Sequence, residues 1–243
     1  MNYYAPPSYQ TFVSHLCHTL LHIATPSFPC YSIPMRITAL QPQATNANRI
    51  NLFVDDRFLM GVNTLIVLQL ALEVGQELTA EQLAQLQHEE QLQQAVDRAL
   101  NYLSFRPRSR EEMRRYLRRK ETNPELIEPV LERLDSLNLI NDRDFTSFWV
   151  ETREQFNPRG SHALRNELRM KGVSRDVVDE LITDENDEEL ALKAGRKKAY
   201  SLLRLPDIDY ATFRNRLGSF LQRRGFGYEI ATKTVKTLWE EMQ

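Results

Sequence analysis

Hydrophobic and polar residues alternate from residue 36 to residue 63, which is the period-2 pattern of half-buried β-strands. In the middle of this segment three apolar residues fall on one side of a strand: Ile50, Leu52 and Val54. Asp55 and Asp56 suit a tight turn into the next strand. We therefore predict a small three-stranded antiparallel sheet. Such a sheet is marginally stable alone, and residues 63–72, with Asn63 as N-cap, supply a covering helix.

The pattern becomes helical at Thr79 and stays helical to the end of the chain. Capping signals mark helix starts at Thr79, Ser109 and Asn123. Gly172 and Gly225 follow basic segments, where a left-handed residue commonly closes a helix. These signals predict a mainly α-helical protein with short breaks between its helices.

Three segments of the helical part repeat one pattern. Aligning three apolar residues, which are spaced by 51 and then 53 positions, defines the repeat: Met113, Leu164 and Leu217. The alignment superposes a second leucine and a terminal basic residue in each segment: Leu117, Leu168 and Leu221, followed by Lys120, Lys171 and Arg224. An apolar helix precedes and follows each segment, so the unit has three helices and occurs three times. Such repeats pack on their neighbours into an elongated, curved body; the alternative is one compact bundle whose amphipathic helices match by chance.

This organisation divides the chain into five parts. Residues 1–34 contain no Lys, Arg, Asp or Glu, and we interpret them as a start assigned too far upstream or as a disordered leader. The remaining parts are the β region with its covering helix, the first three-helix repeat with a lead-in helix, the second repeat and the third repeat: residues 35–78, 79–141, 142–184 and 185–243.

Composition excludes several classes of protein. No apolar run approaches the about 20 residues of a membrane-spanning helix, and both cysteines precede Met35, so a reducing cytoplasm is expected. No glycine-rich phosphate loop is present. Beyond the first 34 residues, His88 and His162 are far apart and lack the spacing of metal ligands. The residues therefore give no support for an enzyme, a cofactor or a metal site, although they leave an enzyme open.

Positive charge is concentrated over residues 105–120, with eight Lys or Arg against two Glu, in a chain whose net charge is -2. On a helical wheel Met113, Tyr116 and Leu117 form an apolar face, and four arginines lie opposite: Arg114, Arg115, Arg118 and Arg119. Arginine suits bidentate contacts to carboxylates and phosphates, which indicates an anion-binding face; the alternative is a solvated helix surface. The residues that we predict to contact a partner or DNA are basic and come from all three repeats: Arg106, Arg108, Arg110, Arg114, Arg115, Arg118, Arg119, Lys120, Arg159, Arg165, Arg169, Lys171, Arg214, Arg223 and Arg224.

The charge is nevertheless polarised, because residues 179–189 hold seven acids and no base. A protein that binds DNA nonspecifically more often has a strong basic surplus, whereas a polarised repeat body fits a protein or a filament of alternating charge. Five aromatic residues have the spacing of a helical core and are interpreted as packing residues, not as a platform for stacking bases: Tyr102, Phe105, Tyr116, Phe148 and Trp149.

These segments resemble the RecX family of bacterial regulatory proteins, which modulate the RecA recombinase. The family stretch Leu-Ser-x-Arg-x-Arg-Ser is matched by Leu103, Ser104, Arg106, Arg108 and Ser109. A leucine- and aspartate-rich link with a following aromatic is matched by Leu139, Asp142 and Phe145. The pattern Gly-x-x-x-Leu-x-x-Glu-Leu-x-x-Lys-Gly is matched by Gly160, Leu164, Glu167, Leu168, Lys171 and Gly172. The resemblance is clear over residues 92–200 and weaker beyond, residues 36–90 are similar to a small β region of some members, and Asn141-Asp142 stands where the family often has Asp-Asp.

The resemblance implies tandem three-helix repeats and a non-enzymatic protein that binds RecA and the filament of RecA on single-stranded DNA, lies along the filament groove, and dampens ATP hydrolysis and strand exchange. We expect a monomer, and a weak direct contact with DNA stays open. A second hypothesis is a DNA-binding protein of the helix-turn-helix type that acts without RecA, with residues 109–120 or 161–171 as recognition helix. Under either hypothesis, the alternative is that these helices only pack the repeats.

Overall fold

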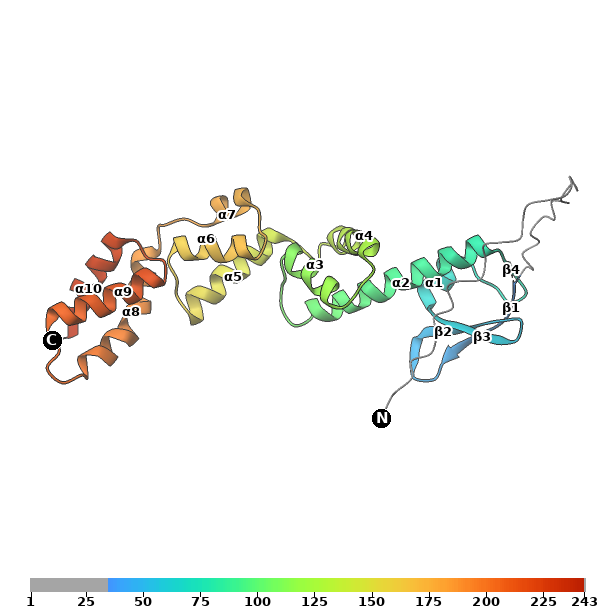
Figure 1. The fold of residues 1–243 in the computed structure, drawn as a ribbon, viewed down its shortest axis with the longest axis horizontal. Helices are drawn as coiled ribbons and strands as arrows, with labels where there is room; N and C mark the ends of the chain where they lie inside the picture. Colours follow the sequence, from blue (N-terminus) through green and yellow to red (C-terminus); the bar gives the residue numbers. More distant parts are fainter. Residues whose placement is uncertain (1–34, 243) are drawn as a thin grey trace, which may run out of the picture.

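The computed structural model describes residues 35–242, and the interpretation of residues 1–34 concerns a segment outside the described residues. The described part is elongated (Figure 1). A β region lies at one end, and three groups of helices follow it along the long axis in sequence order. The predicted α-helical body with a small preceding sheet is therefore confirmed.

The sheet has the order β3-β2-β1-β4, and its neighbouring strands are antiparallel. Its strands are β1 (Met35–Gln43), β2 (Asn46–Val54), β3 (Arg57–Asn63) and β4 (Glu77–Leu78). The three predicted strands are present, and the two-residue β4 adds a fourth by pairing with the start of β1. Asp55 and Asp56 make the predicted turn, with φ values of 48° and 64°.

Helix α1 (Thr64–Gln69) covers the sheet, and the Asn63 side chain caps it by accepting the Leu65 N–H. The helix ends before the predicted residue 72, because the chain turns at Ala71, whose φ is 46°, and then returns to the sheet. The N–H of Gly75 donates to the carbonyl of Ile37 in β1, which places the following residues beside β1 as β4.

Helix α2 (Ala80–Leu103) joins the β region to the repeats as one helix of 24 residues. Thr79 and Gln82 form the predicted capping box at its start. Its first half packs Leu86 into the core of the β region, and its second half packs Ala95 and Ala99 into the core of the first repeat. The predicted lead-in helix and the first helix of the repeat are thus continuous.

The repeats confirm the three-helix unit, and each has its own hydrophobic core. The first uses the end of α2 with α3 (Arg110–Arg119) and α4 (Pro124–Ser136); the second has α5 (Asp142–Phe156), α6 (Ser161–Met170) and α7 (Arg175–Leu181); the third has α8 (Asp187–Leu203), α9 (Tyr210–Arg223) and α10 (Tyr228–Met242). The aligned apolar residues are all buried: Met113, Leu117, Leu164, Leu168, Leu217 and Leu221. The aligned basic residues are the C-caps of the three middle helices: Lys120, Lys171 and Arg224. Gly172 and Gly225 follow two of these caps with the predicted left-handed backbone, at φ values of 82° and 89°.

Candidate partner-binding surface

The middle helices of successive repeats meet end to end. The Ser109 hydroxyl, at the start of α3, donates to the carbonyl of Lys171 at the end of α6, over 2.6 Å. The N–H of Gly160, at the start of α6, donates to the carbonyl of Arg224 at the end of α9, over 3.0 Å. Each junction therefore satisfies a terminal carbonyl of one helix with a donor at the start of another, which also aligns their dipoles favourably.

A second hydrogen bond also recurs at both junctions. Asp142 begins α5 and accepts the Arg110 N–H at 3.0 Å, while Asp187 begins α8 and accepts the Ser161 N–H at 2.9 Å. Burial raises the pKa of both carboxyl groups, although the same N–H donors oppose the rise. At both junctions, an aspartate at the start of one repeat thus caps the middle helix of the preceding repeat.

Glycines allow the repeats to approach closely. A Cβ on Gly160 would overlap the carbonyl group of Gly225, and a Cβ on Gly172 would overlap the side chain of Glu111. Gly160 needs no unusual backbone, since its φ is -72° and its ψ is 156°. The close backbone approach is therefore what requires glycine at position 160.

A charged cluster fills the first junction. The carboxylate of Glu112 accepts hydrogen bonds from both terminal nitrogens of Arg106 at 3.1 Å and from Lys171 Nζ at 2.6 Å, and Lys171 also lies 4.0 Å from the centre of the Trp149 ring. Burial favours the neutral acid, but the hydrogen bonds from Arg106 and Lys171 outweigh it, so the pKa of Glu112 lies below its usual value. Because Glu112 is used here, it does not complete the predicted capping box with Ser109. Arg106 and Lys171 therefore hold the junction together and do not form an exposed basic face.

The four arginines of α3 likewise do not form one unrelieved basic face, which corrects the interpretation of the helical wheel. Arg114 pairs with Glu111 at 2.7 Å and with Glu128 of α4 at 2.8 Å, and Arg115 pairs with Glu111 at 3.0 Å. Only the end of α3 keeps exposed basic side chains with no ion pair among the described residues: Arg118, Arg119 and Lys120. The position of Glu111, three and four residues before the two arginines, could have indicated this pairing.

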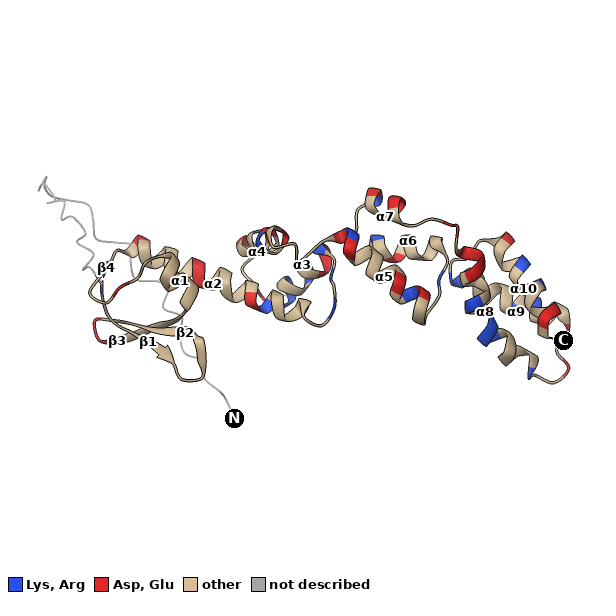
Figure 2. Ribbon diagram, turned by 180° about the vertical axis from the view of Figure 1, so that it is seen from behind, with Lys and Arg blue, Asp and Glu red and all other residues tan. Residues whose placement is uncertain are grey.

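Six further predicted residues make contacts within the protein: Arg108, Arg110, Arg159, Arg165, Arg169 and Arg224. The Arg108 guanidinium lies 3.9 Å from the centre of the Tyr102 ring, and Arg224 donates to the carbonyl of Pro158 at 3.0 Å. Burial lowers the pKa of both of these arginines. The other four pair with carboxylates at 2.9 to 3.8 Å. Figure 2 accordingly shows blue and red segments mixed along the helices, and Arg214 and Arg223 are the exposed predicted residues of the third repeat.

The prediction that Phe105 packs in the core is wrong, because 76% of Phe105 is exposed. Phe156, which lies 51 residues later at the equivalent position of the second repeat, is 75% exposed. Both begin a Phe-x-Pro-Arg sequence immediately before a junction, and this repetition is the signal that could have identified them. Tyr102 and Tyr116, in contrast, stack on each other at 3.9 Å and are packing residues as predicted. The first two repeats thus expose the same aromatic side chain at the same place.

The start of each candidate recognition helix is covered. Helix-turn-helix proteins read bases with the N-terminal residues of the recognition helix. In α3 and α6 this end lies in a junction, where Ser109 is fully buried and Ser161 is 5% exposed. This geometry speaks against α3 or α6 entering a DNA groove by its N-terminus.

Neither a metal-binding cluster nor a membrane-spanning helix is found among the described residues. Residues 35–242 contain no cluster of three or more His, Cys, Asp or Glu that could hold a metal ion. None of the helices in the same range is long and apolar enough to cross a membrane. The exposed aromatic and basic side chains of the repeats form the candidate surface.

The fold defines a tandem-repeat protein that has a small β region and three three-helix units, with a candidate binding surface on successive units. Family models match each part: the "Regulatory protein RecX N-terminal domain" at residues 35–79, and the first, second and third three-helix domains of RecX at residues 95–134, 141–182 and 185–235. Together they match well over half of the 243 residues. The chain belongs to the RecX family.

Individual relatives and solved structures agree with this assignment. The Regulatory protein RecX of Bacillus subtilis (strain 168) is 29% identical over 199 residues, which is 82% of this chain and 75% of that protein. The protein of the same name from Listeria monocytogenes serovar 1/2a is 26% identical over 208 residues, or 86% of this chain and 77% of that protein. A crystal structure of regulatory protein RecX superposes with a TM-score of 0.69 at 25% identity, covering 84% of this chain and 99% of the other. The RecX structure from Lactobacillus salivarius shares the fold, with a TM-score of 0.54 at 24% identity over 63% of this chain and 99% of that one.

Proposed function

We propose that the protein binds RecA and the filament of RecA on single-stranded DNA, and that it mostly inhibits recombinase activity in DNA repair and the SOS response. It acts by binding alone, as a monomer in the cytoplasm, and catalyses no reaction. Membership of the RecX family is the observation that carries this proposal. The binding residues come from the exposed part of the repeats.

The repetition of the exposed surface supports a partner built from identical subunits. Phe105 and Phe156 stand at equivalent positions of the first and second repeats and are exposed to the same extent, 76% and 75%. Equivalent side chains on successive repeats can occupy equivalent sites on successive subunits of a filament. Aromatic residues are enriched at the energetic centres of protein interfaces, because each buries a large apolar area at low entropic cost.

A pull-down with purified RecA from the same organism tests the proposal, in the presence and absence of single-stranded DNA. We expect the protein to retain RecA in both conditions. The double variant Phe105→Ser with Phe156→Ser should lose most of the retained RecA, because it removes both aromatic contacts. The matched control, Leu68→Ser with Val74→Ser, changes two apolar residues of the β region that are 70% and 61% exposed, and should bind as the unchanged protein does.

Two results would contradict the proposal. If the protein retains no RecA but binds DNA tightly and in a salt-sensitive manner, direct DNA binding without RecA is favoured. If RecA is retained equally by the aromatic variant and by the control, the two phenylalanines do not belong to the interface.

A further inference from the structure

The third repeat carries an open groove of about 530 Å³ between α8 and α9. Its polar lining consists of basic side chains, hydroxyls and one amide: Lys198, Ser201, Asn215, Arg216, Ser219 and Arg223. The apolar part of the lining comes from Leu202 and Leu205 of the α8 end and the following turn. The volume lies within the range of small-ligand sites, yet the groove is open to solvent, so a segment of a longer polymer can enter it.

Helical spacing explains how these side chains come to one place. On α9, Arg216, Ser219 and Arg223 occupy positions i, i+3 and i+7 and therefore share one face. On α8, Lys198 and Ser201 are three residues apart and face the same groove. Two helix faces, each alternating a cation with a hydroxyl, thus form the walls.

The charge around the groove is strongly positive. Residues 193–224 contain nine Lys or Arg and two acids, a net charge of +7, and α9 itself contains no Asp or Glu. Within residues 35–242, none of Lys198, Arg216 and Arg223 takes part in an ion pair, whereas Arg114 and Arg115 of α3 both do.

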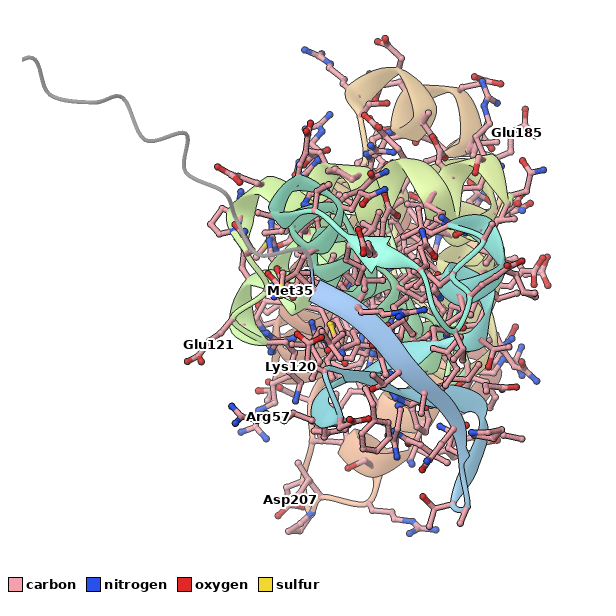
Figure 3. All side chains as sticks on the ribbon, turned by 90° about the vertical axis from the view of Figure 1, so that its right-hand side faces the viewer. Met35, Arg57, Lys120, Glu121, Glu185 and Asp207 are labelled. Atoms are coloured by element: carbon pink, nitrogen blue, oxygen red, sulfur yellow. The ribbon has the colours of Figure 1, made fainter. Side chains whose placement is uncertain are left out.

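The acids of α8 lie at its other end. They occupy its first turn (Asp187, Glu188 and Glu189), and Figure 2 shows the helix red at its start and blue farther along. Figure 3 looks along the long axis and shows Glu185, just before α8, and Asp207, just after it, at opposite edges of the molecule. The groove is at the end of α8 and so is separated from the acidic segment.

The groove face of α9 differs in charge from the equivalent face of α3 in the first repeat. In the repeat alignment, Glu111, Glu112 and Arg115 of α3 correspond to Asn215, Arg216 and Ser219 of α9. All three residues of α3 contact the end of α6. Glu111 packs on Gly172, Glu112 accepts a hydrogen bond from Lys171, and Arg115 donates one to the Met170 carbonyl. No fourth repeat covers the face of α9 within residues 35–242. Arg216 occupies the position equivalent to Glu112, which binds Lys171 at the end of α6. A helix end that carries a lysine would therefore be repelled by Arg216. The face favours an anion.

We propose that this groove binds the phosphodiester backbone of nucleic acid. Arg and Lys side chains with Ser and Asn donors are the usual partners of backbone phosphates, and the groove supplies both kinds. Its lining contains no aromatic ring on which a base could stack, so binding does not depend on base sequence. The contact requires no RecA and thus goes beyond the proposed function.

Fluorescence anisotropy of labelled single-stranded oligonucleotides of two unrelated sequences tests the proposal on the full chain without RecA. We expect the unchanged protein to bind both equally, with an affinity that falls as salt rises. Replacing Lys198, Arg216 and Arg223 by Ala should reduce the slope of log K against log salt by about 2, which corresponds to roughly 100-fold weaker binding near 0.1 M salt. The control removes the same number of positive charges outside the groove, at the exposed residues Arg57, Arg175 and Lys236, of which the last two form ion pairs within their own helices. It should keep the slope of the unchanged protein.

The other outcomes decide between sources of the anion. A labelled duplex that loses affinity in the groove variant supports the same site, because both nucleic acids present phosphates. Equal weakening in the control and the groove variant would overturn the proposal in favour of diffuse charge. If poly-glutamate competes as strongly as nucleic acid at equal charge, the nucleic-acid proposal is overturned in favour of an acidic protein. If inorganic phosphate competes equally well at equal phosphate concentration, the proposal is overturned in favour of a site for a single ion. Circular dichroism verifies that the variants fold, and the RecA pull-down, run separately, keeps a failure here distinct from a failure of the proposed function.

Discussion

A single methyl group at Gly160 tests how closely the second and third repeats pack. The backbone of Gly160 is in a conformation open to every residue, at φ -72° and ψ 156°, so alanine adds no backbone strain. Its Cβ, however, would overlap the carbonyl group of Gly225 and crowd the N–H of Phe226. The obstacle is backbone, which cannot move aside as a flexible side chain does.

The expected cost follows from these contacts. Overpacking by one methyl group typically costs about 1–3 kcal/mol. Because the obstacle here is backbone, we expect a cost of about 3 kcal/mol, the upper end of this range. Alanine also lowers the conformational entropy of the unfolded chain, which stabilises the folded state by about 0.4–1 kcal/mol. We therefore expect Gly160→Ala to destabilise the junction by about 2 kcal/mol. The control is Gly218→Ala in the interior of α9, where nothing lies within 4 Å of the added Cβ and a gain of about 0.5–1 kcal/mol is expected.

Urea unfolding monitored by tryptophan fluorescence measures the effect repeat by repeat. The chain has two tryptophans, Trp149 in the second repeat and Trp239 in the third, so replacing either one by Phe leaves a reporter for one repeat. We expect Gly160→Ala to lower the midpoint seen by Trp239 and to separate the two transitions, because nearest-neighbour interfaces stabilise repeat proteins. Equal midpoints for Gly160→Ala and the unchanged protein would refute the close approach of the repeats.

The remaining predictions concern charged residues. Glu112→Gln should destabilise the protein by about 2 kcal/mol in urea unfolding, because Arg106 and Lys171 then share a half-buried site without a carboxylate; an unchanged midpoint would contradict the role of the cluster. Since the pKa of folded Glu112 lies below its ordinary value, its stabilisation is full above about pH 4.5 and is lost as the pH falls through the folded pKa. The unchanged protein should therefore lose more stability than Glu112→Gln between pH 5 and 3, and parallel losses would be the contrary result. Arg118→Glu with Arg119→Glu should weaken inhibition of RecA several-fold at unchanged stability, as measured by ATP hydrolysis and urea unfolding, and full inhibition would remove the end of α3 from the interface.

The repeat architecture was predictable because its signals are local. Apolar spacing placed Met113, Leu164 and Leu217 in three equivalent helices, and the helix caps follow from single residues and their near neighbours. The short strand β4 was not predictable, since its two residues carry no alternation and owe their conformation to pairing with β1.

The candidate site was harder to predict, because its electrostatics depend on residues far apart in the sequence. Lys171 donates a hydrogen bond to Glu112, which is 59 positions away in the sequence. Because of this contact Lys171 is part of the junction and not of the predicted partner-binding surface. Charge counting along one helix cannot reveal such a pair. The groove of the third repeat was missed for the same reason, since Lys198 and Arg216 come from different helices.

Regulation of RecA is tested by the rate of ATP hydrolysis by RecA on single-stranded DNA, measured as the protein is added. We expect the unchanged protein to lower the rate in a saturable manner. The Phe105→Ser with Phe156→Ser variant should require several-fold more protein for the same effect, while the Leu68→Ser with Val74→Ser control should act as the unchanged protein does. An undiminished rate at saturating unchanged protein would contradict the inhibition of RecA, and equal inhibition by both variants would contradict the role of Phe105 and Phe156 in it.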